Sequence, residues 1–467
     1  MRYFSTRDKT RPVDFRVAAL AGLAPDGGLF VPETIPVYPA AVCSSLGTMG
    51  FCDVAFETIK PWVSPDIPAA VLEDIVHAAY PFPAPLVKVG DRQVLELFHG
   101  PTAAFKDFGA RFMARAFSYL RRGEDRPLRI LVATSGDTGG AVADGFFGVE
   151  GISVTVLYPQ GRVSPLQERQ IAGLGGNVSA LAVDGSFDDC QRLVKAALGD
   201  ADLQKRLALS SANSINVSRL IPQAVYYAVA AGRAFAGITD ADGEASPRVR
   251  YAGAGAPGAD AGGPGAAFAG ARRGVVKGEA ITLVVPSGNF GNLTAGIYAW
   301  KMGAPIKRFV AATNINKTVP DYLESGDYRA RPSRATISNA MDVGAPSNFR
   351  RMAAHLSWEE MKEAIVGIAI SDDDTRETIR KVYNTTAYFL DPHSSVGWTA
   401  ADKLLAQGRI GPGPLGILST AHPAKFAETV EPITAKIPVP PSLAKAMERK
   451  PESRSIPADI SVFKELL

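Results

Sequence analysis

The stretch RILVATSGDTGGAVADGFFG (129–148) predicts the fold class of this chain. Its first six residues are a short apolar run typical of a buried strand, SGDTGG (135–140) is a glycine-rich turn, and AVADGFFG (141–148) is typical of a helix. The same order recurs where ITLVVP (281–286) leads through SGNFGN (287–292) into LTAGIYAWKMG. Further strands are predicted at ISVTVLYP (152–159), VSALAVDG (178–185), RFVAATN (308–314) and LGILST (415–420). Strands that alternate with helices indicate an α/β fold with parallel pairing, whose binding sites lie beyond the carboxyl ends of the strands.

The composition is that of an ordinary soluble globular protein. The chain has 467 residues, 46% of them hydrophobic, which suggests two to three domains with an ample core. A net charge of +3 without a long basic run argues against a nucleic-acid partner, and no apolar run approaches the length of a membrane span. The start, MRYFSTRDKTRPVDF, lacks an apolar signal core, so we expect a cytoplasmic enzyme. Three cysteines predict neither a disulfide framework nor a metal site.

Composition shifts along the chain predict its domain organisation. Residues 1–85 are rich in proline and end near the stiff connector YPFPAPL, which indicates a small N-terminal domain. Residues 86–467 carry the alternating strands and helices and form the predicted catalytic region, with two α/β lobes. Residues 239–275 are Gly/Ala-rich and low in core-forming side chains, so we expect a flexible surface insertion there.

Two glycine-rich loops are candidate anion sites. In SGNFGN, Gly288 and Gly291 let the backbone bend and present N–H groups, with the positive end of a helix behind them. An ordinary tight turn explains the same pattern equally well. In SGDTGG, the hydroxyls of Ser135 and Thr138 are candidate ligands of a second anion, or helix N-caps. Two such loops suggest two anionic groups in one cleft.

Two polar segments add candidate ligands. NSINVSR (213–219) combines amides, a hydroxyl and a cation suited to a phosphate, although a capped helix start with a surface arginine is the simpler alternative. STAHPAKF (419–426) follows the last predicted strand and places Thr420 at a strand end, pointing into the cleft, unless the segment is a plain turn. We interpret most histidines as structural; these are His77, His355, His393 and His422. His99 is close to Lys106 in the sequence and therefore stays a candidate.

Lys106 stands at the head of an apolar helix in HGPTAAFKDFGARFMARAF (99–117). Phe105 and Phe108 flank it with apolar surface, and both burial and the positive helix end favour the neutral amine. The alternative is a lysine that extends from a helix end into water. A neutral lysine forms Schiff bases with aldehydes. Pyridoxal phosphate has such an aldehyde, a phosphate for SGNFGN, and a ring nitrogen that needs a partner such as Thr420.

These motifs resemble the threonine synthase family of fold-type II pyridoxal-phosphate enzymes. HGPTAAFKDFGARFMAR is similar to that family's cofactor-lysine motif, and GLAPDGGLFVP (22–32) to its N-terminal domain. Further motifs follow in the family's order: ATSGDTGGAVA, SSANSINVSRL, VVPSGNFGNLTAG, AATNINKTVP, TISNAMDVGAPSNF and STAHPAKF. The resemblance covers nearly the whole chain outside the insertion. It implies a tryptophan-synthase-β-like α/β fold: two open, twisted, mostly parallel sheets with helices on both faces, plus a small N-terminal domain.

The resemblance also implies residue roles. Lys106 is the amine that forms a Schiff base with the cofactor and later moves protons. Thr420 hydrogen-bonds the pyridine nitrogen. The residues implied to hold the cofactor phosphate are Gly288, Asn289, Phe290, Gly291 and Asn292. Those implied to bind the substrate's phosphate and neighbouring groups are Ser135, Thr138, Asn213, Ser214 and Arg219. No role follows for Asp137, which stands where many fold-type II relatives place an asparagine near the cofactor's 3-hydroxyl.

The implied reaction is γ-elimination of phosphate from O-phospho-L-homoserine and β-addition of water, which gives L-threonine in the last step of threonine biosynthesis. One alternative is a serine/threonine dehydratase-like lyase of the same fold type, which needs no second phosphate site. Another is a non-catalytic homologue that binds a phosphorylated ligand, although such a module does not need Lys106. The expected partner is the small-molecule substrate, for a monomer or homodimer without nucleic acid or membrane.

Overall fold

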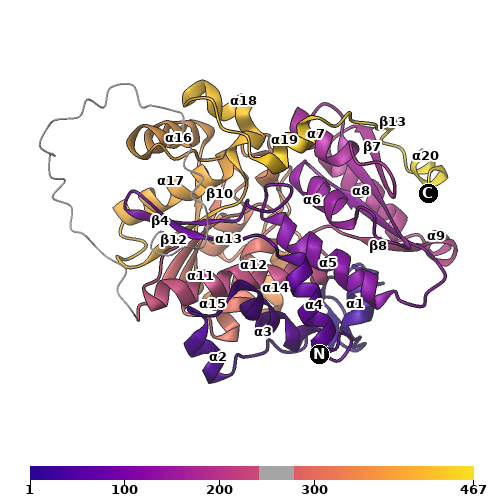
Figure 1. The fold of residues 1–467 in the computed structure, drawn as a ribbon, viewed down its shortest axis with the longest axis horizontal. Helices are drawn as coiled ribbons and strands as arrows, with labels where there is room; N and C mark the ends of the chain where they lie inside the picture. The colour runs from indigo at the N-terminus through magenta and orange to yellow at the C-terminus, as the bar shows by residue number, and fades with distance from the viewer. Residues whose placement is uncertain (241–277) are drawn as a thin grey trace, which may run out of the picture.

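Two open sheets organise the protein (Figure 1). The computed structural model describes residues 1–240 and 278–467. The insertion predicted at 239–275 therefore lies outside the described residues, except for Thr239 and Asp240. Within the described residues, no helix is both long and apolar enough to cross a membrane.

The two sheets are mostly parallel, as the sequence predicts. In the described part of the chain, the larger sheet has the order β11 (Ile365–Ala369), β10 (Ile306–Thr313), β9 (Ile281–Pro286), β12 (Leu415–Ser419), β4 (Arg92–Glu96) and β3 (Leu86–Val89). Its β3–β4 hairpin is antiparallel and its other pairs are parallel. The smaller sheet is parallel throughout, in the order β13 (Arg454–Pro457), β7 (Val178–Asp184), β6 (Ile152–Pro159), β5 (Leu128–Ala133) and β8 (Ala208–Ser211).

Both faces of each sheet are buried, because successive side chains along a strand point to opposite faces. On β9, Leu283 and Val285 join one hydrophobic core while Val284 joins another. On β5, Ile130 joins the first of these cores and Leu131 a third. Burial on both faces is typical of parallel sheets covered by helices. The prediction of helices on both faces is therefore confirmed.

Helices supply the cover of both sheets. Outside the N-terminal segment they are α5 (Lys106–Leu120), α6 (Asp137–Phe146), α7 (Pro165–Ala172), α8 (Phe187–Leu198), α9 (Ala201–Arg206), α10 (Val217–Leu220), α11 (Ala224–Ala236), α12 (Gly291–Met302), α13 (Thr318–Ser325), α14 (Phe349–His355), α15 (Trp358–Ala364), α16 (Asp372–Thr386), α17 (Pro392–Ala406), α18 (Ala427–Val430), α19 (Pro441–Met447) and α20 (Ile460–Glu465). In Figure 1, α8 and α20 lie beside the smaller sheet and α16 and α17 beside the larger one.

The first 80 residues form a helical layer with a two-stranded ribbon. Strands β1 (Tyr3–Ser5) and β2 (Phe30–Pro32) pair antiparallel. The helices of this segment are α1 (Phe15–Ala21), α2 (Ala40–Ser45), α3 (Phe51–Val63) and α4 (Ala69–Ala79). Buried side chains of the segment, such as Trp62 and Leu72, belong to the same core as Phe108 of α5. The boundary predicted at residue 85 stays a prediction.

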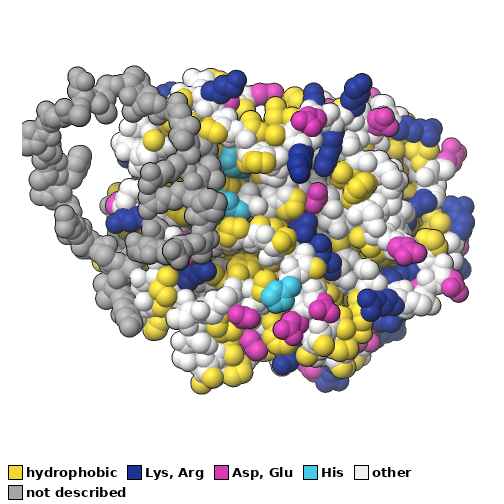
Figure 2. All heavy atoms as spheres, viewed as in Figure 1, with side chains coloured by type: hydrophobic (Ala, Val, Ile, Leu, Met, Phe, Trp, Pro, Cys, Tyr) yellow, Lys and Arg dark blue, Asp and Glu magenta, His cyan; other side chains and the backbone are white. Residues whose placement is uncertain are grey.

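Charged side chains of both signs share the face of the molecule that Figure 2 shows. On the face that Figure 2 shows outside the grey atoms, Lys and Arg are interspersed with Asp and Glu. This distribution agrees with the small net charge of +3. The electrostatics that matter for a ligand are therefore local to a site.

Candidate active site

One cavity between the two sheets collects all the predicted site residues. It lies at the carboxyl ends of β5, β9 and β12, where SGDTGG, SGNFGN and STAHPAKF begin. Parallel strands place their following loops at one edge, which explains why segments far apart in the sequence meet there. The predicted residues that line the cavity are Lys106, Ser135, Thr138, Asn213, Ser214, Arg219, Gly288, Asn289, Phe290, Gly291, Asn292 and Thr420.

A closed loop before α5 positions Lys106. The side chain of Asp107 accepts hydrogen bonds from Thr102, from its backbone N at 2.9 Å and from its hydroxyl at 2.5 Å. A Cβ on Gly100 would lie 2.4 Å from the Asp107 carboxylate, so only glycine fits there. The backbone N of Phe105 donates to the carbonyl of Thr420 at 2.9 Å. The residues of the HGPT-x-x-FKD motif therefore have a structural role, because they fix the turn from which Lys106 projects.

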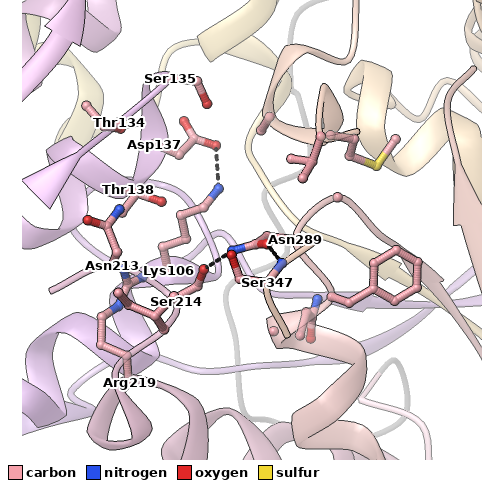
Figure 3. A pocket seen from close by; sticks show the side chains of 18 of the residues that line it. Lys106, Thr134, Ser135, Asp137, Thr138, Asn213, Ser214, Arg219, Asn289 and Ser347 are labelled. Atoms are coloured by element: carbon pink, nitrogen blue, oxygen red, sulfur yellow. Dashed lines mark hydrogen bonds and ion pairs between the residues drawn. The ribbon is translucent and has the colours of Figure 1, made fainter. Parts of the chain in front are cut away.

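The surroundings of Lys106 favour its neutral form. Burial lowers the pKa of Lys106, and the nearby charges of Lys425 and Arg219 lower it further. Asp137 acts in the opposite direction, with its Oδ2 3.7 Å from the Lys106 Nζ. Figure 3 shows the amine pointing toward that carboxylate. The sequence prediction of a lowered lysine pKa agrees with this arrangement.

Asp137 is a buried carboxylate that remains ionised. Burial alone would raise its pKa, but Lys425, Lys106 and a hydrogen bond from Gln167 hold the pKa of Asp137 well below its usual value. The Nζ of Lys425 lies 2.8 Å from Asp137 Oδ1, and Gln167 Nε2 donates to the same oxygen at 2.9 Å. Sequence reasoning missed Lys425 and Gln167. Lys425 stands in the STAHPAKF segment, but no local pattern in that segment marks its contact with Asp137.

The SGNFGN loop presents unpaired backbone donors. Phe290 has a φ of 60° and marks the start of α12. Among the described residues, the N–H groups of Gly288, Asn289 and Phe290 donate to no protein acceptor. The side chain of Asn289 is engaged instead: it donates to Ser214 Oγ at 2.6 Å and accepts from the backbone N of Ser347 at 2.6 Å (Figure 3). The loop therefore offers its backbone, rather than this amide, to an anion.

Two buried donors around the cavity lack partners among the described residues. They are the Nε of Arg219 and the Nδ2 of Asn292. Arg219 is 2% exposed, and burial lowers its pKa to about 10, which leaves it charged at neutral pH. The Oδ1 of Asn292 accepts from the hydroxyls of Tyr226 and Tyr227. An unpaired buried donor is costly, so this donor set fits anionic ligands such as phosphates.

The other predicted substrate ligands fall into two groups. The hydroxyls of Ser135 and Thr138 have no hydrogen-bond partner among the described residues. They do not cap the helix, because the hydroxyl of Thr134 accepts the hydrogen bonds from the backbone N of Gly136 and Gly139 at its start. Asn213 is engaged, because its side chain bonds both backbone groups of Ala133 at the end of β5. Ser214 Oγ accepts from Asn289. These last two side chains hold the site together.

Three of the histidines have partners that explain their positions. His393 lines the cavity, but its Nδ1 pairs with Asp391 at 2.9 Å and its Nε2 accepts from the N of Ala340. Burial lowers the pKa of His422 to about 3, and its Nδ1 accepts from the N of Ala424. His99 pairs with Glu96 at 2.7 Å. None of the three is poised as a general base in this arrangement.

Comparison with known proteins agrees with this geometry. Residues 94–263 and 267–420 match the family model of pyridoxal-phosphate dependent enzymes, residues 2–80 the threonine synthase N terminus, and residues 394–467 the threonine synthase C-terminal region. The chain belongs to the threonine synthase family. Within that family, the threonine synthase of Escherichia coli is 37% identical, over 100% of this chain and 99% of the relative. The threonine synthase of Haemophilus influenzae is 39% identical, over 95% and 94%.

Solved structures of threonine synthases match the whole chain. The Escherichia coli crystal structure has a TM-score of 0.84 and 36% identity, covering 100% of this chain and 99% of that one. The PLP-bound threonine synthase of Brucella melitensis has a TM-score of 0.83 and 34% identity, covering 100% and 98%. The predicted fold type and cofactor class are therefore confirmed. A threonine deaminase from Solanum lycopersicum, with a TM-score of 0.53 and 15% identity, shares the fold alone.

Proposed function

We propose that the protein is a threonine synthase that converts O-phospho-L-homoserine and water into L-threonine and phosphate. The observation that supports this most is that one cavity holds the largely buried Lys106 together with two groups of anion donors. One group is the backbone of the SGNFGN loop. The other includes Arg219 and the unengaged hydroxyls of Ser135 and Thr138. A substrate and a cofactor that each carry a phosphate need both groups.

The residues present fit pyridoxal phosphate. We assign its phosphate to the unpaired backbone N–H groups of Gly288–Asn292 at the start of α12. The amine of Lys106 is placed to react with its aldehyde. The hydroxyl of Thr420, which is buried at the end of β12, is the proposed partner of its ring nitrogen. When bound, the cofactor supplies an electron sink that stabilises negative charge on substrate carbon atoms.

The chain's own residues bind the substrate and move protons. Arg219 supplies a fixed positive charge for the substrate's phosphate, and Ser135 and Thr138 supply hydroxyl donors. Once the substrate amine has replaced it, the free amine of Lys106 is the base that takes protons from the substrate carbons. Asn213 and Ser214 fix the positions of the loops, through the hydrogen bonds of Asn213 to Ala133 and of Asn289 to Ser214. Thr420 is neutral and so does not force a proton onto the ring nitrogen.

We assign the substrate as the partner of this site and propose a cytoplasmic enzyme that acts as a monomer or homodimer, without nucleic acid or membrane. The test is a product analysis of the purified full chain with pyridoxal phosphate. We expect a yellow protein whose colour is bleached by borohydride, and which releases threonine and phosphate in equal amounts from O-phosphohomoserine. A yellow protein that leaves this substrate intact but makes a 2-oxo acid from serine or threonine would move the assignment to a dehydratase.

A further inference from the structure

Lys425 is a fully buried lysine that joins three loops around the cavity. Its side chain is 0% exposed. Its Nζ lies 2.8 Å from Asp137 Oδ1 in the SGDTGG loop and donates to the carbonyl of Thr102 at 2.8 Å, in the loop before Lys106. Lys425 itself follows β12 in STAHPAKF. Burial of a lysine is costly unless its charge is paired, so a structure that keeps one here invites a functional explanation.

The two oxygens of Asp137 face different lysines. Oδ1 receives both Lys425 at 2.8 Å and Gln167 Nε2 at 2.9 Å. Oδ2 faces Lys106, at the longer distance of 3.7 Å (Figure 3). The short contacts therefore anchor the carboxylate on the side away from Lys106. Gly136 leaves room for Gln167, because a Cβ at this position would lie 2.4 Å from the Gln167 Nε2.

Asp137 creates a problem for the reactivity of Lys106. A buried carboxylate needs a compensating positive charge. If Lys106 were the sole cation in contact, it would be held as an ammonium ion, which has no lone pair to attack an aldehyde. Lys425 supplies that charge instead, and the Asp137–Lys425 pair is neutral as a whole when it faces Lys106.

We propose that Lys425 is a positioning residue that neutralises and anchors Asp137, so that Lys106 is free to lose its proton and react with the cofactor's aldehyde. The proposal rests on the proposed function only in taking Lys106 as the reactive amine. It also gives Asp137 a place in the site: its carboxylate orients the Lys106 amine without retaining the proton.

Other charged groups surround the pair and stay unchanged in the test. Arg219 on α10 lowers the Lys106 pKa, and the charge of Lys425 lowers the pKa of Asp107 on α5. Among the described residues, Lys425 also acts on His422, while Asp144 acts on Asp107 and His99 on His422. Since all five are retained in every variant, a change in Lys106 titration reports on Asp137 and Lys425.

The test measures the titration of Lys106 in the full chain freed of cofactor, by competitive acylation across pH and mass spectrometry of the Lys106 peptide. In Lys425→Met, the unpaired carboxylate should raise the midpoint of Lys106 by about one pH unit or more. In Asp137→Asn, the unpaired ammonium of Lys425 should lower it. The double variant, which removes both charges, should return the midpoint close to wild type. A purely structural role does not predict shifts of opposite sign.

Two further variants serve as controls. Lys425→Arg retains the charge and should hold the midpoint within about 0.3 pH units of wild type. Lys403→Met removes a lysine of α17 that lies at the same 2.8 Å distance from a carboxylate, Asp374 of α16, and should leave Lys106 unchanged. If Lys425→Met does not fold, Asp137→Asn and Lys425→Arg still test the proposal, because the first must lower the midpoint and the second must keep it.

The outcomes separate this proposal from the proposed function. A wild-type protein that binds pyridoxal phosphate and releases threonine, but whose Lys106 midpoint is the same in all variants or moves in one direction only, overturns the role of Lys425 alone. A wild-type protein that never forms the borohydride-sensitive yellow species contradicts the proposed function, whatever the midpoints are.

Discussion

The SGDTGG loop after β5 and the SGNFGN loop after β9 both join a buried strand to a helix at the same cavity. The first turn of α6 carries the carboxylate of Asp137, whereas the first turn of α12 has no acidic residue. A helix N-terminus attracts one negative charge, and in SGDTGG the protein itself supplies it. In SGNFGN the N–H groups of Gly288, Asn289 and Phe290 have no acceptor among the described residues, so we expect a ligand to supply the charge. The same strand–loop–helix pattern can therefore hold an ion pair of the protein itself or the phosphate of a ligand.

The largest effect is expected when SGNFGN receives an acidic residue like the one that SGDTGG already has. Asn292→Asp is nearly isosteric, and the tyrosine hydroxyls that donate to its Oδ1 can donate to a carboxylate as well. We expect the Kd for pyridoxal phosphate to rise about 100-fold, because the new charge lies beside the proposed phosphate position. Fluorescence titration of the apoprotein measures this. Asn384→Asp, on the exposed surface of α16, adds the same charge elsewhere and should have no effect.

A steric change in the same loop should have a smaller effect. A Cβ on Gly288 would lie 2.7 Å from the Cα of Met341 and 2.8 Å from the carbonyl of Ala340, so the loop must move. We expect Gly288→Ala to weaken cofactor binding about tenfold while leaving the lysine titration intact. Gly411→Ala, where nothing lies within 4 Å, is the matched control. Wild-type affinity in Gly288→Ala would show that the backbone of this loop does not hold the phosphate.

The pH dependence of stability tests the ion pair of the SGDTGG loop. The pKa of Asp137 lies well below its unfolded value near 3.8, because the two lysines outweigh burial. A carboxyl group with a lowered pKa contributes stability above its unfolded pKa, and this contribution is lost as pH falls toward the folded pKa. The free energy of unfolding of wild type relative to Asp137→Asn should therefore decrease from about pH 5 to pH 2. Urea unfolding at both values measures it, and a constant difference would contradict the ion pair.

The sequence was sufficient to predict the fold and the lining of the site. Strand–loop–helix order places Ser135 and Gly288 at carboxyl ends of parallel strands, and the structure brings them into one cavity with Lys106. Short strands without periodicity, such as β13, were not predicted, since their pairing depends on a distant partner.

The sequence could not predict the partners of Asp137 either, because these contacts are also long-range. Lys425 contacts Thr102 across 323 positions of the chain, and no local pattern marks such a contact. Gln167 follows Ser164 in a capping box, which explains the glutamine locally and conceals its bond to Asp137. Long-range ion pairs are set by the assembled sheets rather than by neighbouring residues.

We propose that Lys106, and not the more deeply buried Lys425, is the amine that takes the cofactor. The direct measurement is borohydride reduction of the yellow protein, followed by proteolysis and mass spectrometry of the labelled peptide. The account predicts a single pyridoxyl-phosphate label on Lys106 and no label in Lys106→Ala. A label on Lys425, or a label that persists in Lys106→Ala, would contradict it.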